Sequence, residues 1–358
     1  MRFVQIVLAI PAVLAVLAGP AEAARTRVFS TDTYEAFRRC ELQGVALTED
    51  GRAILGPELL LLDDPGARTI WALAPDGRGG VLLATGDGGQ VLARGPGGGQ
   101  TVTPADTTEP AERRDQRDDA SRSQVLATLF DAEVFALAAD GRGSFYAAGA
   151  PVGTITRVSP QGEARTLFDV PEGVVFALLA RADGTVFAAT GDRGRLYRIS
   201  PGGDGKVLYE APDLSLRSLA WGNDGKIWAG TDGRGLVLEI DPESGDARIR
   251  YDAEEDEIVA LVPLPDGGLV FGANPALGGG SGSGGTGGDA GGAPGGTGAG
   301  GGSGGRGPVL YRMDPDGAVR RFWTSPEKML HAVVAGARGE ILAATSDRAS
   351  VYRIAPDG

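Results

Sequence analysis

Short apolar runs separated by glycine- and aspartate-rich segments fill most of the chain. Within residues 174–209 the apolar runs are Val174–Leu179, Val186–Thr190, Leu196–Ile199 and Val207–Tyr209. The segments between them supply residues that adopt the positive φ angles and side-chain-capped conformations of tight turns. Apolar residues follow one another within each run instead of alternating, which is typical of strands buried on both faces. The pattern therefore predicts four antiparallel strands joined by hairpin turns.

This four-strand pattern recurs at a fixed spacing. The first run of each unit carries a short motif, found as IWAL (Ile70–Leu73), VFAL (Val134–Leu137), VFAL (Val175–Leu178), LRSL (Leu216–Leu219), IVAL (Ile258–Leu261) and LHAV (Leu330–Val333). The closing residues Leu137, Leu178, Leu219 and Leu261 lie 41, 41 and 42 positions apart. Such a period is typical of repeat proteins, in which each unit buries its faces only against the next.

Two longer gaps between units contain segments without apolar periodicity. The first, at about residues 95–124, includes the polar run ADTTEPAERRDQRDDASRS, and the second, residues 278–307, is almost entirely glycine with serine, threonine and alanine. Neither composition can bury enough apolar surface to offset the entropy of ordering its backbone. Because repeat sequence resumes in register at VLYRMDPDG, we expect both segments to be disordered insertions, and the glycine tract to be removable without loss of the fold.

The ends of the repeat region suggest how it closes. The last unit, Met329–Ile354, has three predicted strands, while Glu58–Leu62 precedes the first complete unit and aligns with an outermost strand. Pairing these two segments would complete a sixth unit and remove exposed strand edges. The hairpin GVALTEDGRAILGP at Gly44–Pro57 is then left over, which favours, as alternatives, a seventh partial unit or a chain truncated from a longer one.

Two of the repeats carry a resemblance to known families. The segments DGTVFAATGDRGRLYRISPGG (183–203) and DGKIWAGTDGRGLVLEIDPESG (224–245) resemble blades of two-component-regulator, NHL, SMP-30 and streptogramin-lyase propellers, and of bacterial proteins loosely labelled WD40-like. Four antiparallel strands in about 40 residues are the signature of a propeller blade. We therefore expect an all-β protein, a β-propeller of four-stranded antiparallel blades over residues 44–358, six in number or alternatively seven. These families share turn chemistry more than active sites, so the resemblance implies little about activity.

The N-terminal residues have the pattern of an export signal. Arg2 is followed by an apolar run from Phe3 to Ala18 and by the small-residue pattern Ala21-Glu22-Ala23. We expect residues 1–23 to be removed, leaving an N-terminal segment at 24–43, a periplasmic or extracellular location and no membrane span; an uncleaved anchor is the alternative. Cys40 is the only cysteine, so no internal disulfide can form.

The charge balance excludes one class of partner. Asp and Glu number 47 against 34 Lys and Arg, which gives a formal net charge of −13. A chain this acidic, with no basic stripe, repels a phosphate backbone. We therefore expect no nucleic acid partner.

One position of the opening motif is a candidate binding site. Two residues before the closing Leu or Val, the six units carry Trp71, Phe135, Phe176, Arg217, Val259 and His331. In a closed ring these residues would surround one mouth of the channel, so Trp71, Phe135, Phe176, Arg217 and His331 are candidates for binding a protein, peptide or glycan at one rim. The competing interpretation, which we favour for the three aromatic residues, is core packing between blades; Arg217 would then pair with a neighbour and His331 would be structural.

The inventory of reactive side chains favours a protein without catalysis. A single histidine and a single cysteine leave no nucleophile–histidine set except one that uses His331, and no zinc or copper site. The recurring Asp87, Asp192, Asp232 and Asp347 suggest a cation site, but aspartate in a glycine-rich hairpin ordinarily caps its own turn. We expect no metal, no cofactor and an exported ligand-binding or sensory propeller. The alternative is a metal-dependent lactonase or lyase, although its oxygen donors Glu133, Asn223, Glu257 and Asn274 do not fall in one column.

Overall fold

The structure is a computed structural model whose described residues are 65–76, 79–86, 88–95, 123–129, 131–213, 215–276, 307–336, 339–346 and 350–356, with the backbone of four short strands before residue 102. The chain divides into two compact units, residues 1–60 with 101–110 and residues 61–100 with 111–358. The expected signal 1–23, the segment 24–43 and the bodies of both expected insertions lie outside the described residues. None of the described residues forms a helix with the length and hydropathy of a membrane span.

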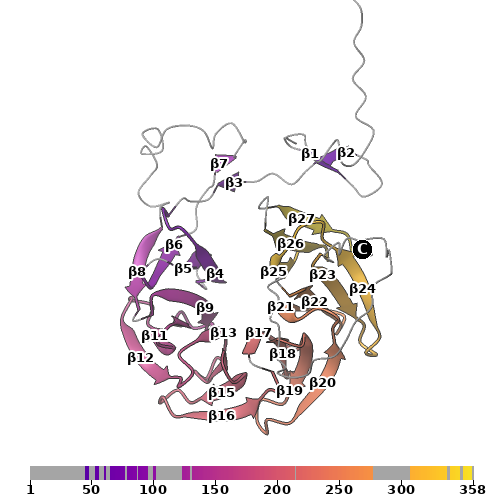
Figure 1. The fold of residues 1–358 in the computed structure, drawn as a ribbon. Coiled ribbons are helices and arrows are strands. Elements are labelled where there is room, and N and C mark those ends of the chain that lie inside the picture. The colour runs from indigo at the N-terminus through magenta and orange to yellow at the C-terminus, as the bar shows by residue number, and fades with distance from the viewer. Residues whose placement is uncertain are drawn as a thin grey trace, which may run out of the picture. The chain divides into compact units, whose positions relative to one another are not determined.

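Over its described residues the larger unit is built from six successive groups of antiparallel strands, which we call blades 1 to 6 (Figure 1). Blade 1 contains β4 (Ile70–Pro75), β5 (Val81–Thr85), β6 (Gln90–Arg94) and β8 (Gln124–Thr128). Blade 2 contains β9 (Glu133–Ala139), β10 (Phe145–Ala150), β11 (Thr154–Val158) and β12 (Ala164–Asp169). Blade 3 contains β13 (Val175–Ala180), β14 (Val186–Thr190), β15 (Arg195–Ile199) and β16 (Gly205–Glu210).

The remaining blades repeat this order. Blade 4 contains β17 (Ser215–Trp221), β18 (Ile227–Asp232), β19 (Leu236–Ile240) and β20 (Ala247–Asp252). Blade 5 contains β21 (Glu257–Pro263), β22 (Leu269–Asn274), β23 (Val309–Met313) and β24 (Val319–Thr324), and a single residue pair, Asp232 with Glu257, links it to blade 4. Blade 6 contains three described strands, β25 (Leu330–Ala335), β26 (Ile341–Thr345) and β27 (Val351–Ile354). The all-β class and the strand order predicted from the repeats are confirmed, whereas the number of blades in the complete ring stays a prediction.

The core lies between successive blades. The first strands β4, β9, β13, β17, β21 and β25 face a common centre, and the fourth strands lie at the periphery (Figure 1). In one apolar cluster Tyr146 and Ile155 of blade 2 pack against Val186 and Ile199 of blade 3, while Phe187, on the other face of β14, packs in the cluster shared with blade 4. Each sheet thus buries both of its faces, which explains the consecutive apolar residues in its strands.

The opening stretch of repeat sequence folds largely as predicted. Val186, Ala188 and Leu196 are fully buried, whereas Leu208, on the outer strand β16, is only partly buried. Asp183 is exposed in the β13–β14 turn, and Asp192 is exposed in the β14–β15 turn with a φ of 61°. A positive φ is tolerated by aspartate better than by most residues, so Asp192 has the turn role expected of it.

Both insertions interrupt a blade without disturbing its pairing. β6 pairs with β8 across the first insertion, and β22 pairs with β23 across the glycine tract, with Ala273 opposite Val309. Gly307, next to β23, is in tight contact with its surroundings, because a Cβ there would lie 2.1 Å from the carbonyl oxygen of Ser325. Gly307 therefore belongs to the blade although it ends the glycine-rich segment.

Deletion of residues 278–306, joining Leu277 to Gly307, is expected to leave the fold intact. The strands on either side already pair as a hairpin, and shortening a loop costs little conformational entropy. The midpoint of thermal unfolding of the deletion variant should differ from that of the parent by less than about 4 °C. A second deletion that also removes Gly307 should be less stable, because Leu277 would then carry a side chain against Ser325. A large loss in the first variant would show that the tract packs on the blades.

The pairing expected between the two ends of the chain is not found among the described strand pairs. Leu60–Leu61 forms β3, inside the predicted strand Glu58–Leu62, but its partner is β7 (Gln100–Thr101) and not β27. The predicted earlier hairpin is present, with β1 (Val45–Leu47) antiparallel to β2 (Ala53–Leu55).

Candidate functional site

The position predicted from sequence coincides with a β-bulge in the first strand of every blade. In blade 3, Val175 lies opposite Thr190 and Ala177 opposite Ala189, so Phe176 is the extra residue of the strand. The same register shift isolates Trp71, Phe135, Arg217, Val259 and His331 in their blades. A bulge leaves its extra residue outside the ladder and redirects its side chain, a device common beside binding sites. We call these six the bulge residues.

Four of the bulge residues form a continuous row across blades 1 to 4. The rings of Trp71 and Phe135 meet edge to face with centroids 5.1 Å apart, and those of Phe135 and Phe176 stack at 6.0 Å. The guanidinium of Arg217 lies 4.6 Å from the centre of the Phe176 ring. The structure therefore brings Trp71, Phe135, Phe176 and Arg217 together, as the candidate site required.

The aromatic bulge residues are not part of the buried core. Trp71 is 45% exposed, and Phe135 and Phe176 are partly buried, in contrast to Phe187, which is fully buried. Glycines in the β5–β6 and β14–β15 turns make room for two of these rings: a Cβ on Gly86 would lie 2.7 Å from Nε1 of Trp71, and one on Gly191 would lie 3.1 Å from Cε2 of Phe176. The three rings are therefore less buried than the interpretation as core residues requires, and the choice between binding site and core packing stays a prediction.

A polar chain continues from the row toward blade 6. Nε of Arg217 donates to Oε1 of Glu257 at 2.7 Å, and Nδ2 of Asn274 donates to Oε2 of Glu257 at 3.0 Å. The same Nδ2 also donates to the carbonyl of Leu330, whose N–H donates to Oδ1 of Asn274. These bonds fix β25 next to its bulge, where the His331 side chain is exposed. His331 is thus at the expected position but is not joined to the aromatic residues by any described contact.

Blade 4 has a carboxylate at the end of its second strand, next to the bulge residue. Asp232 stands where blades 1 and 3 have Gly86 and Gly191, directly after a threonine near the end of the second strand. Partial burial, and then the nearby carboxylate of Glu257, raise the pKa of Asp232 above its ordinary value, while Arg217 opposes them; Asp213 and Asp256 add further negative charge. Asp232 makes no hydrogen bond or ion pair with a described side chain. The surroundings of Asp232 therefore disfavour the charged form of its carboxyl group.

Asp232→Asn is expected to stabilise the fold at neutral pH. A carboxyl whose folded-state pKa is raised contributes stability below its unfolded pKa, and this contribution is lost as the pH rises through the folded value. Asparagine has no charge to lose, so the variant should unfold at a higher temperature at pH 7, and its advantage should vanish below about pH 4. Thermal unfolding at the two pH values measures this, with Asp224→Asn, an exposed carboxylate of the same blade, as control. Equal stability of the parent and Asp232→Asn at pH 7 would contradict the conclusion that burial and neighbouring carboxylates destabilise the charged Asp232.

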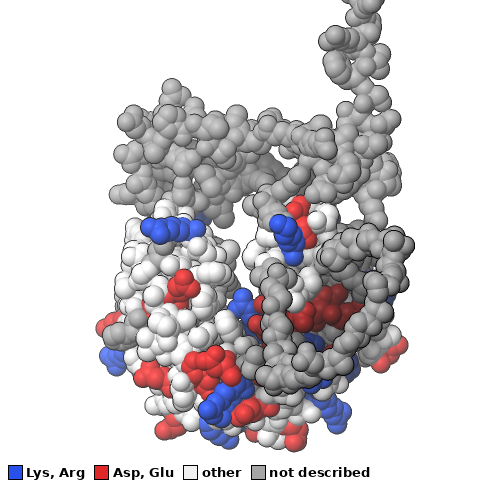
Figure 2. Space-filling model, viewed as in Figure 1, with Lys and Arg blue, Asp and Glu red and all other residues white. Residues whose placement is uncertain are grey.

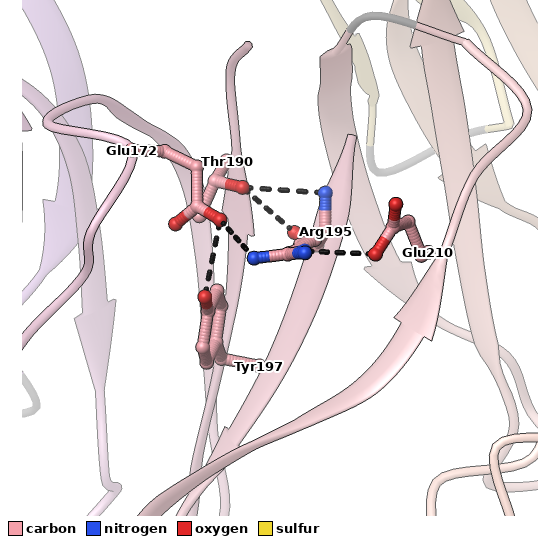
Figure 3. Close-up of polar contacts among 5 residues, drawn as sticks. All are labelled: Glu172, Thr190, Arg195, Tyr197 and Glu210. Carbon is pink, nitrogen blue, oxygen red and sulfur yellow. Dashed lines mark hydrogen bonds and ion pairs between the residues drawn. The ribbon is translucent and has the colours of Figure 1, made fainter. Parts of the chain in front are cut away.

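Sequence reasoning missed a second repeated feature, an acid in the connection that enters each of blades 2 to 6. Asp131, Glu172, Asp213, Glu255 and Glu327 recur with the spacing of the repeats. Oε1 of Glu172 accepts hydrogen bonds from Tyr197 at 3.1 Å and from Nη1 of Arg195 at 3.0 Å (Figure 3). Equivalent tyrosines bond Glu255 (Tyr311) and Glu327 (Tyr352). We call this contact between the entering connection and the third strand the acid latch. The sequence feature that could have indicated it is the spacing of the acids, 41, 41 and 42 positions from Asp131 to Glu255.

The latch is incomplete in blade 4. Leu238 occupies the third-strand place of Tyr197 and Tyr311, as the strand pairing shows, so Asp213 has no phenol to bond. One oxygen of Asp213 accepts a hydrogen bond from the hydroxyl of Thr231 at 2.5 Å, and the side chain is only partly buried. It lines an open depression of about 500 Å³ together with Asp192, Arg193, Glu210, Ala211, Pro212 and Gly233.

The described residues offer little for metal chemistry. In the part of the chain that the structure describes, no three His, Cys, Asp or Glu side chains come together as ligands for a metal ion. Of the donors considered for a lactonase, Glu257 and Asn274 are in contact, while Nδ2 of Asn223 donates to the carbonyl of Leu264 at 2.7 Å, near the opposite ends of β17 and β21.

Comparisons with solved structures identify the fold. A streptogramin B lyase aligns over 87% of this chain and 85% of its own with a TM-score of 0.57 and 13% identity. YCF48 bound to a D1 peptide aligns over 84% and 81%, with a TM-score of 0.54 and 13% identity. The extracellular domain of the hybrid two-component system BT3049 from B. thetaiotaomicron aligns over 86% of this chain and 36% of its own, with a TM-score of 0.54 and 11% identity.

Comparisons of sequence add no family to this result. No family model matches the chain, and neither does any curated protein. The likeness to the solved structures is one of fold, and it agrees with the strand order and with the first strands that face a common centre. The chain is a β-propeller built from four-stranded antiparallel blades.

Proposed function

We propose that this protein is an exported binding propeller that takes a protein or peptide ligand on the face formed by its bulge residues, as a sensory or docking module of a larger assembly. The row of Trp71, Phe135, Phe176 and Arg217 carries the proposal, because four blades present large side chains that contact one another and stay partly exposed. Partly exposed aromatic and arginine side chains are the residues most enriched in the centres of protein interfaces.

Two of the structural neighbours support this type of role. YCF48 is solved with a bound D1 peptide, and BT3049 contributes the extracellular domain of a two-component system. The apolar N-terminal pattern with Ala21-Glu22-Ala23 supports export, and the surplus of acidic over basic residues supports the absence of a nucleic acid partner. A glycan ligand is a weaker candidate, because aromatic rings that contact one another have less free face on which a sugar could stack.

Phe176→Ala tests the role of the row. Because Phe176 is partly buried, we expect a loss of about 1–2 kcal/mol in the free energy of unfolding, against about 3–5 kcal/mol for Phe187→Ala in the core. Binding of peptides selected on the full chain from a random library should weaken at least about tenfold in Phe176→Ala. Phe168→Ala, a partly buried phenylalanine on the outer strand β12, is the matched control and should bind like the parent. Equal binding by the parent, Phe176→Ala and Phe168→Ala would contradict the proposal.

A lyase is the second candidate, and the exposure of His331 at its bulge favours it. Histidine is the side chain that most often acts as a general acid or base in enzymes. Incubation of the full chain and of His331→Ala with a streptogramin B antibiotic and Mg²⁺, followed by mass spectrometry, separates the two functions. Product formation that requires His331 would replace the non-catalytic role; an unchanged antibiotic supports binding alone.

A further inference from the structure

The bulge row and the depression beside it form one surface. Gly191 lies under the Phe176 ring, and the next residue, Asp192, lines the depression. The guanidinium of Arg217 also lies over the Phe176 ring. Arg217 is on β17, and Gly233, directly after the paired strand β18, lines the depression; a Cβ on Gly233 would lie 3.5 Å from Oδ1 of Asp213. A ligand on the aromatic rings therefore also meets the depression between blades 3 and 4.

The negative charge of this surface is not balanced by the protein. Asp192, Asp213 and Asp232 make no ion pair with a described residue, and Asp192 is exposed to solvent in its turn. The nearby guanidinium of Arg217 is already paired with Glu257 at 2.7 Å, and Arg195 is paired with Glu172 and with Glu210 at 2.9 Å. Arg193 is the cation that lines the depression without a described acidic partner. Figure 2 shows acidic and basic side chains side by side on the visible face of the larger unit.

Two of these carboxylates stand at places where the residues differ between blades. Asp213 is the latch acid of blade 4, yet Leu238 replaces the tyrosine that bonds the latch acid in blades 3 and 5. Asp232 replaces the glycine that lies next to the bulge residue in blades 1 and 3. Local departures from a self-consistent repeat, without a structural gain in the fold itself, are typical of functional sites.

From this charge pattern we propose that the ligand is an extended peptide segment of a partner protein that carries lysine or arginine together with large apolar side chains. The inference rests on the proposed binding function and names its partner chemistry. An apolar side chain of the segment lies on Trp71, Phe135 and Phe176, while its cationic side chains enter the depression and pair with Asp213 and Asp192. Cations of a partner compensate the carboxylates that the fold leaves unpaired, and complementary charge fixes which segments bind.

Selection of a displayed library of random twelve-residue peptides on the immobilised full chain tests this partner chemistry. We expect the enriched peptides to carry Lys and Arg in excess over Asp and Glu, together with aromatic or large aliphatic residues. The Kd of a representative synthetic peptide should rise at least about tenfold in Asp213→Asn, which keeps an oxygen to accept the Thr231 hydroxyl, and should rise with salt. Asp224→Asn, a carboxylate at the opposite end of the strands of blade 4, is the control and should bind like the parent.

The outcomes separate this inference from the proposed function. Enriched peptides that are neutral or acidic, and that lose affinity in Phe176→Ala, overturn the cationic partner while the binding face stands. Basic peptides unaffected by Asp213→Asn overturn it as well. Peptides insensitive to both Phe176→Ala and Asp213→Asn overturn the face and the partner together, as does a library without enrichment. Circular dichroism of each variant shows whether a loss of binding comes from a loss of folding.

Discussion

Gly235→Ala is expected to destabilise the propeller by at least about 3 kcal/mol. Gly235 ends the β18–β19 turn with a φ of 63°, and a Cβ built on it would lie 1.9 Å from the carbonyl oxygen of Glu255. The obstacle is backbone, so no side-chain rotation relieves it. The carbonyl of Gly235 also accepts a hydrogen bond from the N–H of Ala253 at 3.1 Å, which the displaced chain would lose.

Gly225→Ala is the matched control for this prediction. Gly225 has a φ of 80° in the β17–β18 turn, but nothing lies within 4 Å of its Cβ position. Alanine there meets only the intrinsic cost of a left-handed backbone, about 1–2 kcal/mol. Thermal or denaturant unfolding of the two variants should therefore separate steric exclusion from backbone strain. If both glycines cost the same to replace, the contact between Gly235 and the connection at Glu255 has no energetic weight.

The close approach at Gly235 belongs to a repeated arrangement. A Cβ on Gly89 would lie 2.1 Å from the carbonyl of Asp131, and one on Gly194 would lie 2.5 Å from that of Asp213. In each blade concerned, the turn before the third strand thus lies directly against the connection that carries the latch acid. The glycine belongs to the blade before the connection, and the acid side chain bonds the third strand of the blade after it, so each such connection contacts both of the blades that it joins.

The strands could be predicted from sequence because their signal is local and repeated. Turn residues and apolar runs recur in every unit, so the bounds of β13 to β16 agree with the predicted runs to within two residues. The column of bulge residues could also be aligned, because the bulge adds one residue at the same place in every first strand. A shared position in a repeat predicts a shared position in space.

Exposure and partner choice could not be read from the same alignment. Phe176 and Phe187 are both phenylalanines in apolar strands, yet only Phe187 is fully buried, because a bulge changes the direction of one side chain without changing the pattern. The latch could not be predicted because the acid and the tyrosine that bonds it lie on different segments, 25 positions apart in Glu172 and Tyr197 and 56 apart in Glu255 and Tyr311. Long-range pairs of this kind leave no local periodicity.

The latch has a large energetic weight where its acid is buried, and Glu255→Ala is expected to cost about 2–4 kcal/mol. The Glu255 side chain is 3% exposed and its Oε2 accepts a hydrogen bond of 2.8 Å from Tyr311, whose pKa is raised by burial and by this carboxylate. The raised pKa keeps the phenol protonated, so it remains a donor at neutral pH. Truncation leaves a buried hydroxyl without its acceptor and removes the side-chain contact between the connection and β23.

Glu254→Ala provides the control one residue away. Glu254 is 61% exposed and pairs with Arg321 at 2.8 Å, an ion pair that solvent screens, so its loss should cost about 0–1 kcal/mol. Tyr311→Phe removes the other partner of the buried bond, and a double-mutant cycle with Glu255→Ala should give a coupling of about 1 kcal/mol or more. Additive effects would mean that the acid and the tyrosine stabilise the fold independently. A coupling confined to Glu255 and absent at Glu254 would show that the repeated acid holds the blades through the tyrosine and not through surface charge.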